Sequence, residues 1–153
     1  MNQDISREGR KNLDRLVDLI RFRLQDKGKA KSTDAQGNTI YVDTSIYGRE
    51  TLEAFVTLSI SDFNQTPDFT DYTIENSRFV DCFADILVEG AVLYALSSQA
   101  LIERGREFSI GDDGLQFTPP TISEMLNTQF STLLSHHWEK MKYIKLNIDD
   151  FRK

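Results

Sequence analysis

The sequence feature that most constrains the fold is a segment, residues 86–96, that is almost free of charge. It reads Ile-Leu-Val-Glu-Gly-Ala-Val-Leu-Tyr-Ala-Leu, so that Glu89 is its one charged residue. A helix that is apolar on nearly every side has to be covered by other protein. We therefore expect a helix over about residues 77–104 to form the centre of a small bundle, which is completed either by other helices of the chain or by neighbouring subunits.

Three further helices are predicted by apolar residues that recur at three- and four-residue steps. They cover about residues 5–25, 49–63 and 122–144, and in the first of them Leu19 and Phe22 widen the apolar stripe. The last helix has the clearest start, because a Thr-Ile-Ser-Glu capping box precedes it. A chain of 153 residues is large enough to bury a core as one domain. The expected fold class is therefore mainly α, a single four-helix, bundle-like domain with a long central helix.

Two segments have β character. Residues 39–44, inside a polar and extended link over residues 29–48, predict a short strand. Residues 108–117 predict a hairpin, because short alternating runs flank a turn bounded by two glycines. A short strand needs a partner strand, in this chain or in another, and such segments often gain it from a neighbouring protein. The residues expected to dock partners here are Ile40, Tyr41, Val42, Phe108, Ile110, Leu115 and Phe117.

Charge is distributed unevenly along the chain. Residues 1–31 hold nine Lys/Arg and five Asp/Glu, a net charge of +4, whereas residues 32–153 hold nine and nineteen, a net charge of −10. This asymmetry indicates that the basic first helix meets an acidic surface, its own or that of a neighbour. Nucleic acid is the other candidate partner. The arginines expected at subunit interfaces are Arg15, Arg21, Arg23, Arg104 and Arg106.

Three acidic residues, Asp81, Asp85 and Glu89, stand four residues apart and should form one stripe on the central helix. A carboxylate site for a metal is one interpretation. Metal sites in helical bundles usually draw on Glu-x-x-His pairs, however, and His136 and His137 are adjacent, so they point about 100° apart on a helix. The plainer interpretations are a strip that faces solvent or a channel, or a set of partners for basic residues of the first helix or of another subunit.

Two residues of the apolar segment need a particular explanation. Glu89 has to find a cation if it is buried, and Arg15, Arg21 or Arg23 could provide it; otherwise it lies on an exposed edge. Gly90 weakens a helix by up to about 1 kcal/mol relative to alanine. We expect it to permit the close approach of another backbone, that of the first or the fourth helix.

The sequence contains no arrangement that is typical of catalysis. It has no nucleophile paired with a base and no phosphate-binding glycine loop. We therefore expect neither enzymatic activity nor a cofactor or resident metal. The longest apolar run falls short of the roughly 18 residues of a membrane span, and the N-terminus lacks the order of a signal peptide. The single cysteine, Cys82, is expected to be a small buried hydrophobic residue.

Four segments give the chain a resemblance to a known class of proteins. They are Asp62–Pro67, Val88–Ala91, Ala100–Glu107 and Phe117–Pro120, and the likeness extends over about residues 49–147. The chain resembles the head–tail connector, or adaptor, proteins in the neck of tailed bacteriophages. The resemblance implies a helical subunit of a ring, commonly twelvefold, that is assembled in the host cytoplasm and lies beneath the portal protein of the virion. Such a ring extends the DNA channel without binding DNA specifically, and it receives the next neck or tail component.

The resemblance also assigns roles to particular residues. It implies a C-terminal docking tail over residues 145–153, with the apolar and basic residues Leu146, Ile148, Phe151 and Arg152. The residues expected to face the channel are Asp81, Asp85, Glu89, Asp112 and Asp113. Negative walls would let the duplex slide, because affinity for DNA comes from cations. The alternatives are another virion component (a stopper, a tail-completion protein or a baseplate protein), a small enzyme with a carboxylate site, and a regulatory DNA-binding protein; small helical folds serve many such roles.

Overall fold

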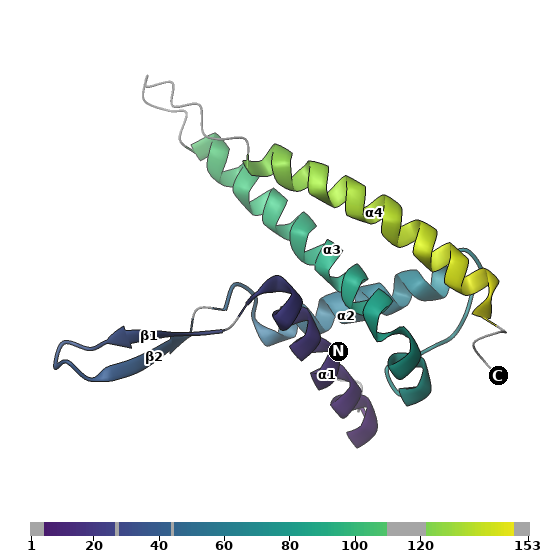
Figure 1. Cartoon of the computed structure of the whole chain (residues 1–153), viewed down its shortest axis with the longest axis horizontal. Helices are drawn as coiled ribbons and strands as arrows, with labels where there is room; N and C mark the ends of the chain where they lie inside the picture. The colour runs from purple at the N-terminus through teal and green to yellow at the C-terminus, as the bar shows by residue number, and fades with distance from the viewer. Residues whose placement is uncertain (1–4, 27, 44, 110–121, 149–153) are drawn as a thin grey trace.

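The computed structural model describes residues 5–26, 28–43, 45–109 and 122–148, which form four helices and one antiparallel pair of strands (Figure 1). The elements are α1 (Arg7–Leu24), β1 (Lys29–Thr33), β2 (Thr39–Asp43), α2 (Arg49–Gln65), α3 (Ser77–Ser109) and α4 (Ile122–Leu146). The mainly α fold predicted from the sequence is confirmed, including the long central helix.

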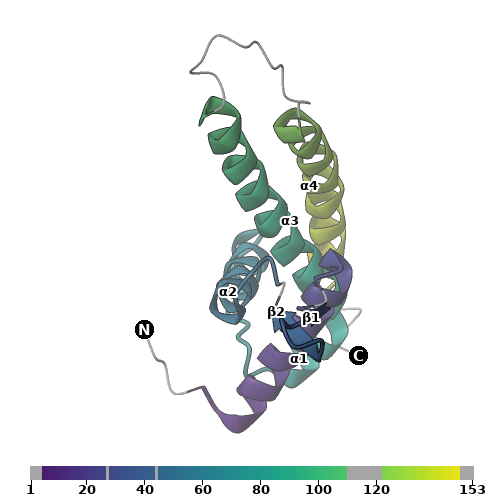
Figure 2. The same cartoon turned by 90° about the vertical axis from the view of Figure 1, so that its left-hand side faces the viewer.

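The central helix α3 contacts each of the other three helices. Helices α1 and α2 pack around its N-terminal half, and α4 runs beside it along most of its length (Figures 1 and 2). Beyond α1 and α2, the two helices continue alone as a two-helix stalk, which we define as residues 99–109 of α3 and 122–134 of α4 (Figure 2). The charge-free segment of α3 thus lies where the chain itself provides cover on several sides.

The core is built from the apolar stripes of the helices. Within each stripe the apolar residues recur at helical spacing, so the stripes of α1, α2 and α4 each face α3. The most deeply buried large side chains come from all four helices: Leu16, Ile20, Leu52, Val56, Phe63, Val80, Leu87 and Met141. The stripe of α1 is narrower than predicted, because Leu19 and Phe22 are exposed on its outer side. Cys82 is also exposed, so the expectation that it is buried is wrong.

At Gly90, three helices approach one another closely. A Cβ atom at this position would overlap Oγ of Ser59 on α2, and it would lie 3.1 Å from Cβ of Ser59 and 3.3 Å from Cε1 of His137 on α4. The Ser59 hydroxyl donates a hydrogen bond to the carbonyl oxygen of Leu87, at 2.8 Å. The expected close approach is therefore made by side chains of α2 and α4, rather than by the backbone of α1 or α4.

The predicted helix end is confirmed for the first helix and wrong for the third. The first helix ends at Leu24 and is capped by Gln25, which adopts a left-handed conformation with φ of 56° and donates its backbone N–H back into α1. The third helix continues to Ser109, so the strand predicted to begin at Phe108 is wrong there. A three-residue alternation is too short to tell a strand from a helix, and Gly105 costs the helix only about 1 kcal/mol. The rest of the predicted hairpin, with Ile110, Asp112, Asp113, Leu115 and Phe117, lies outside the described residues.

The strand predicted at residues 39–44 is present as β2, and its partner β1 precedes it in the same chain. The turn between them is held by Asp34, whose Oδ1 accepts hydrogen bonds from the backbone N–H groups of Asn38 (2.7 Å) and Gln36 (3.0 Å). Gly37 has φ of 86°, which glycine adopts without strain. We call residues 29–43 the hairpin arm, because they project away from the helices (Figure 1).

Candidate functional site: surfaces for assembly

The acidic stripe of α3 is paired with cations of the same chain. Arg15 forms an ion pair with Asp81, and Arg23 forms one with Asp85, at 3.1 Å. On α4, Lys140 bonds both Asp85 and Glu89, the latter at 3.1 Å. Three carboxylates thus meet three cations, and the row carries no net charge. Of the interpretations from sequence, the structure contains the pairing with basic residues of the first helix, and it adds a lysine of α4 that was not expected.

Burial distinguishes the members of this row. The side chain of Asp85 is 68% exposed, and surface pairs of this kind contribute about 0–1 kcal/mol to stability. The side chain of Glu89 is only 15% exposed, and its cation is Lys140 rather than an arginine of α1. The hydrogen bond from Lys140 is the main cause that lowers the pKa of Asp85. Burial acts to lower the pKa of Lys140 itself, but its hydrogen bonds to Asp85 and Glu89 raise it overall.

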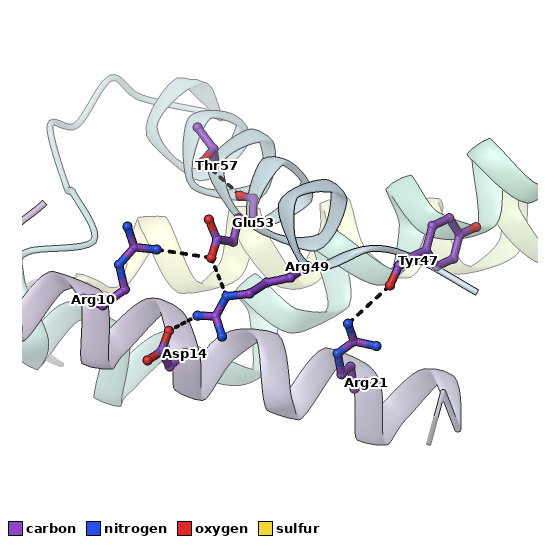
Figure 3. Close-up of polar contacts among 7 residues, drawn as sticks. All are labelled: Arg10, Asp14, Arg21, Tyr47, Arg49, Glu53 and Thr57. Carbon is purple, nitrogen blue, oxygen red and sulfur yellow. Dashed lines mark hydrogen bonds and ion pairs between the residues drawn. The ribbon is translucent and has the colours of Figure 1, made fainter. Parts of the chain in front are cut away.

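A second polar cluster joins α1 to the start of α2 (Figure 3). Arg49 contacts Asp14 and donates from Nε to Oε1 of Glu53 at 2.8 Å. The same carboxylate oxygen of Glu53 also accepts from Arg10, at 3.2 Å. The hydrogen bond to Glu53, followed by the one to Asp14, raises the pKa of Arg49. This cluster links α1 to the first turns of α2.

The two ends of the hairpin arm are tied to each other and to α1. Asp26 is buried, and its carboxylate accepts from Arg21 (3.1 Å) and from the backbone N–H of Ile46 (3.2 Å). Arg21 also donates to the carbonyl oxygen of Tyr47, at 3.2 Å (Figure 3). The Tyr47 hydroxyl in turn donates to the carbonyl oxygen of Ala95 in α3, at 2.6 Å. The base of the arm is therefore part of the rigid body, and Arg21 serves this anchor.

The hairpin arm itself has little cover. Its strands pair with each other, and neither packs extensively on a helix (Figure 1). From residue 31 to residue 41, every side chain is exposed except that of Asp34, which is half-buried. Ile40 and Tyr41, both predicted to dock a partner, are 40% and 65% exposed. The side chain of Val42 lies outside the described part of the structure.

Other apolar side chains are exposed on the helices. A groove of about 550 Å³ lies between α1 and α3, and we call it the α1–α3 groove. It is lined by Leu19, Phe22, Arg23, Gln25, Ala84, Asp85 and Val88. Exposed apolar side chains also occur along the stalk and the adjoining turn of α4, and they are Leu101, Ile102, Ile122, Met125, Leu133 and Trp138. Arg104, predicted at a subunit interface, is exposed on this stalk, whereas the side chain of Arg106 lies outside the described part.

The C-terminal segment begins inside α4. Lys145 is buried, and its Nζ donates to the carbonyl oxygen of Asp68 (2.7 Å) and to Oγ1 of Thr70 (2.8 Å). Burial is the main cause that lowers its pKa. Of the residues predicted to dock partners here, Leu146 is exposed, whereas Ile148 packs against the core. Phe151 and Arg152 lie outside the described residues.

A small cavity of about 230 Å³ lies where α2, α3 and α4 meet. His137 lines it and is 4% exposed, and its Nδ1 has no hydrogen-bond partner among the described residues. Burial is the main cause that lowers the pKa of His137. In the same cavity, the Tyr94 hydroxyl donates to Asp62 at 2.5 Å. Burial, together with this bond, raises the pKa of Tyr94 to about 12.

Within the described ranges, no group of three or more His, Cys, Asp or Glu side chains could hold a metal ion. Among the helices of those ranges, none combines the length and apolar character needed to cross a membrane. No family model matches the chain, and no significant match was found among curated proteins or solved structures.

Proposed function

We propose that this protein is a structural subunit that assembles side by side into a ring at the head–tail junction of a tailed phage, where it extends the DNA channel below the portal protein. The observation that supports the proposal is the hairpin arm. An isolated two-stranded hairpin is marginally stable in water, yet this arm has a defined register and a rigid base. An exposed hairpin of this kind gains stabilising contacts when another chain covers it.

The exposed apolar residues support assembly as well. The stalk is two helices thick, and its outer side chains include Leu101 and Met125, both more than half exposed. Several exposed apolar side chains on so short a pair of helices favour a protein–protein contact there. The two surfaces project from different parts of the same rigid body (Figures 1 and 2). That arrangement suits a subunit with neighbours on more than one side, which a ring beneath a portal requires.

The charged row on α3 is compatible with a channel wall in one respect. Its carboxylates are satisfied by Arg15, Arg23 and Lys140, so the row has no excess of cations that would bind DNA phosphates. The chain as a whole carries a net charge of −6. In the proposed ring, the duplex would pass without tight binding.

The test is reconstitution with the portal protein of a phage that encodes this chain. Mixing the purified chain with portal rings should give a second ring below the portal in electron micrographs, and quantitative mass analysis should give about twelve chains per portal. A test variant has residues 31–41 replaced by a short glycine linker. It should keep its helical circular dichroism, which controls for folding, and fail to form the ring. Absence of the chain from purified virions of that phage would refute the proposal.

A further inference from the structure

We propose that the hairpin arm of one copy docks in the α1–α3 groove of the next copy. The inference rests on the proposed function, since it names the contact through which the subunits of the ring would join. Both surfaces belong to the same chain and differ from each other, so the contact can repeat from copy to copy, and such a head-to-tail contact forms a ring when the rotation between copies closes.

The groove has the composition of a protein contact. Phe22 is 77% exposed on α1, although a phenylalanine buries a large apolar area when it is covered. Leu19 lies one turn before it, and Ala84 and Val88 of α3 complete the apolar lining. Arg23 at the rim is already paired with Asp85. An apolar surface with polar neighbours remains for an incoming segment.

The arm offers matching side chains. In the register of the two strands, Lys31 is opposite Tyr41, and Thr33 is opposite Thr39, so these four residues share one face of the ladder. Tyr41 is 65% exposed and can place an amphipathic ring against Phe22 of another copy. This face therefore supplies an aromatic anchor and a cation side by side.

Charge favours the same pairing. The hairpin arm has two lysines and two aspartates and so no net charge, whereas the whole chain carries −6. Two copies repel each other overall, and a contact made by the neutral arm avoids that repulsion. Next to the groove, Asp18 lies one turn before Phe22 on α1; it is exposed and has no ion-pair partner among the described residues. We assign Asp18 of the receiving copy as the partner of Lys31.

The arm cannot reach the groove of its own chain. Gln25 lines the groove, and the arm begins only four residues later, at Lys29, and leads away from the helices (Figure 1). Folding back would require Asp26 to release the backbone N–H of Ile46. The occupant is therefore a second chain, and a second copy supplies the complementary charge and anchor described above.

Cross-linking through introduced cysteines tests the contact directly. In a Cys82→Ser background, the pair Thr39→Cys and Leu19→Cys places one thiol on the arm and one in the groove, and leaves Tyr41 and Phe22 intact. A short bifunctional thiol reagent should yield a ladder of dimers, trimers and larger species, because each copy has one donor and one acceptor site. Neither single variant should give more than dimers. The control pair, Thr39→Cys with Glu139→Cys on α4, should give no ladder. A ladder from the control pair that equals the test pair, or no ladder at any protein concentration, would overturn the proposal.

A charge exchange gives an independent readout. Lys31→Glu and Asp18→Lys should each reduce the yield of the cross-linked ladder about tenfold, and the two changes together should restore most of it. If the combined variant is no better than the single ones, these two residues do not meet. The outcomes separate this inference from the proposed function. A chain that is found in the virion and gives no ladder refutes only the arm–groove contact, whereas a ladder from a chain that is absent from virions refutes only the role in the phage.

Discussion

Replacing Gly90 by alanine should destabilise the protein, although alanine is the better helix former. Its Cβ atom would overlap the Ser59 hydroxyl, and that hydroxyl is buried and bonded to the carbonyl oxygen of Leu87. Alanine contributes about 1 kcal/mol through its helix propensity. Against this, displacing the hydroxyl from a buried hydrogen bond costs about 1–3 kcal/mol, and crowding a packed site costs about 1–3 kcal/mol more. We expect a net loss of about 1–5 kcal/mol in the free energy of unfolding.

The measurement is urea denaturation followed by circular dichroism, with Gly105→Ala as the matched control. Gly105 lies in the same helix, and a Cβ atom there would meet no other atom within 4 Å. That variant should therefore gain up to about 1 kcal/mol. Opposite signs for the two substitutions are the expected result. If Gly90→Ala stabilises the protein as much as Gly105→Ala does, the close crossing of α2, α3 and α4 is not a constraint on the fold.

A double variant locates the clash. Ser59→Ala removes the hydroxyl that the new Cβ atom would overlap. The free energy lost by Gly90→Ala together with Ser59→Ala should then be smaller than the sum of the two single losses, by about 1 kcal/mol or more. Additive losses would indicate that the backbone, rather than the Ser59 hydroxyl, is displaced by the alanine.

Three further outcomes are expected. Lys140→Gln should cost about 1.5–3 kcal/mol, because it leaves the poorly exposed Glu89 without its cation. The hydrogen bond from Lys140, together with Arg23, holds the pKa of Asp85 below its usual 3.8, so ionised Asp85 contributes stability above that pH that is lost as the pH falls through the lowered folded-state pKa. The variant keeps Arg23, so its stability curve against pH should show a smaller acid-side loss, and an unchanged loss would contradict this. Tyr47→Phe should cost about 0.5–1.5 kcal/mol in urea denaturation, since it removes the bond to α3, and an unchanged midpoint would show that the bond contributes nothing. Backbone amides of the hairpin arm should exchange with deuterium within seconds in the monomer, and their exchange should slow down on assembly. As a control, amides of α3 around residues 86–96 should stay protected in both states. Equal protection of the arm before and after assembly would contradict the proposed docking.

Helices were predictable here because their signal is local. The stripe of α1 and the charge-free segment of α3 identify two helices without any knowledge of the fold, and β-branched residues at 39–43 identify β2. The partner strand was harder, because Lys-Ala-Lys-Ser-Thr has little β propensity. It forms because the turn held by Asp34 brings it alongside β2, a contact that its own residues do not predict.

The candidate site was less predictable because it depends on how the helices are rotated against one another. The stripe that includes Glu89 was evident from spacing, but the identity of its cation was not, since Lys140 lies on a helix that the sequence does not orient. For the same reason, the helical spacing places Phe22 in the apolar stripe of α1, whereas in the structure it is exposed beside α3. A phenylalanine at the edge of a stripe is compatible with either position, and only the packing of the neighbouring helix decides.

Because α3 is one helix from Ser77 to Ser109, it is also a lever. At 1.5 Å per residue, the crossing at Gly90 divides it into lengths of about 20 Å and 28 Å. A sideways force on the C-terminal end of α3 would act on that crossing through the longer of the two lengths, so its torque there would be larger than that of an equal force on the N-terminal end. The residues that would take up this force are Ser59 and His137, because they lie against Gly90 from α2 and α4.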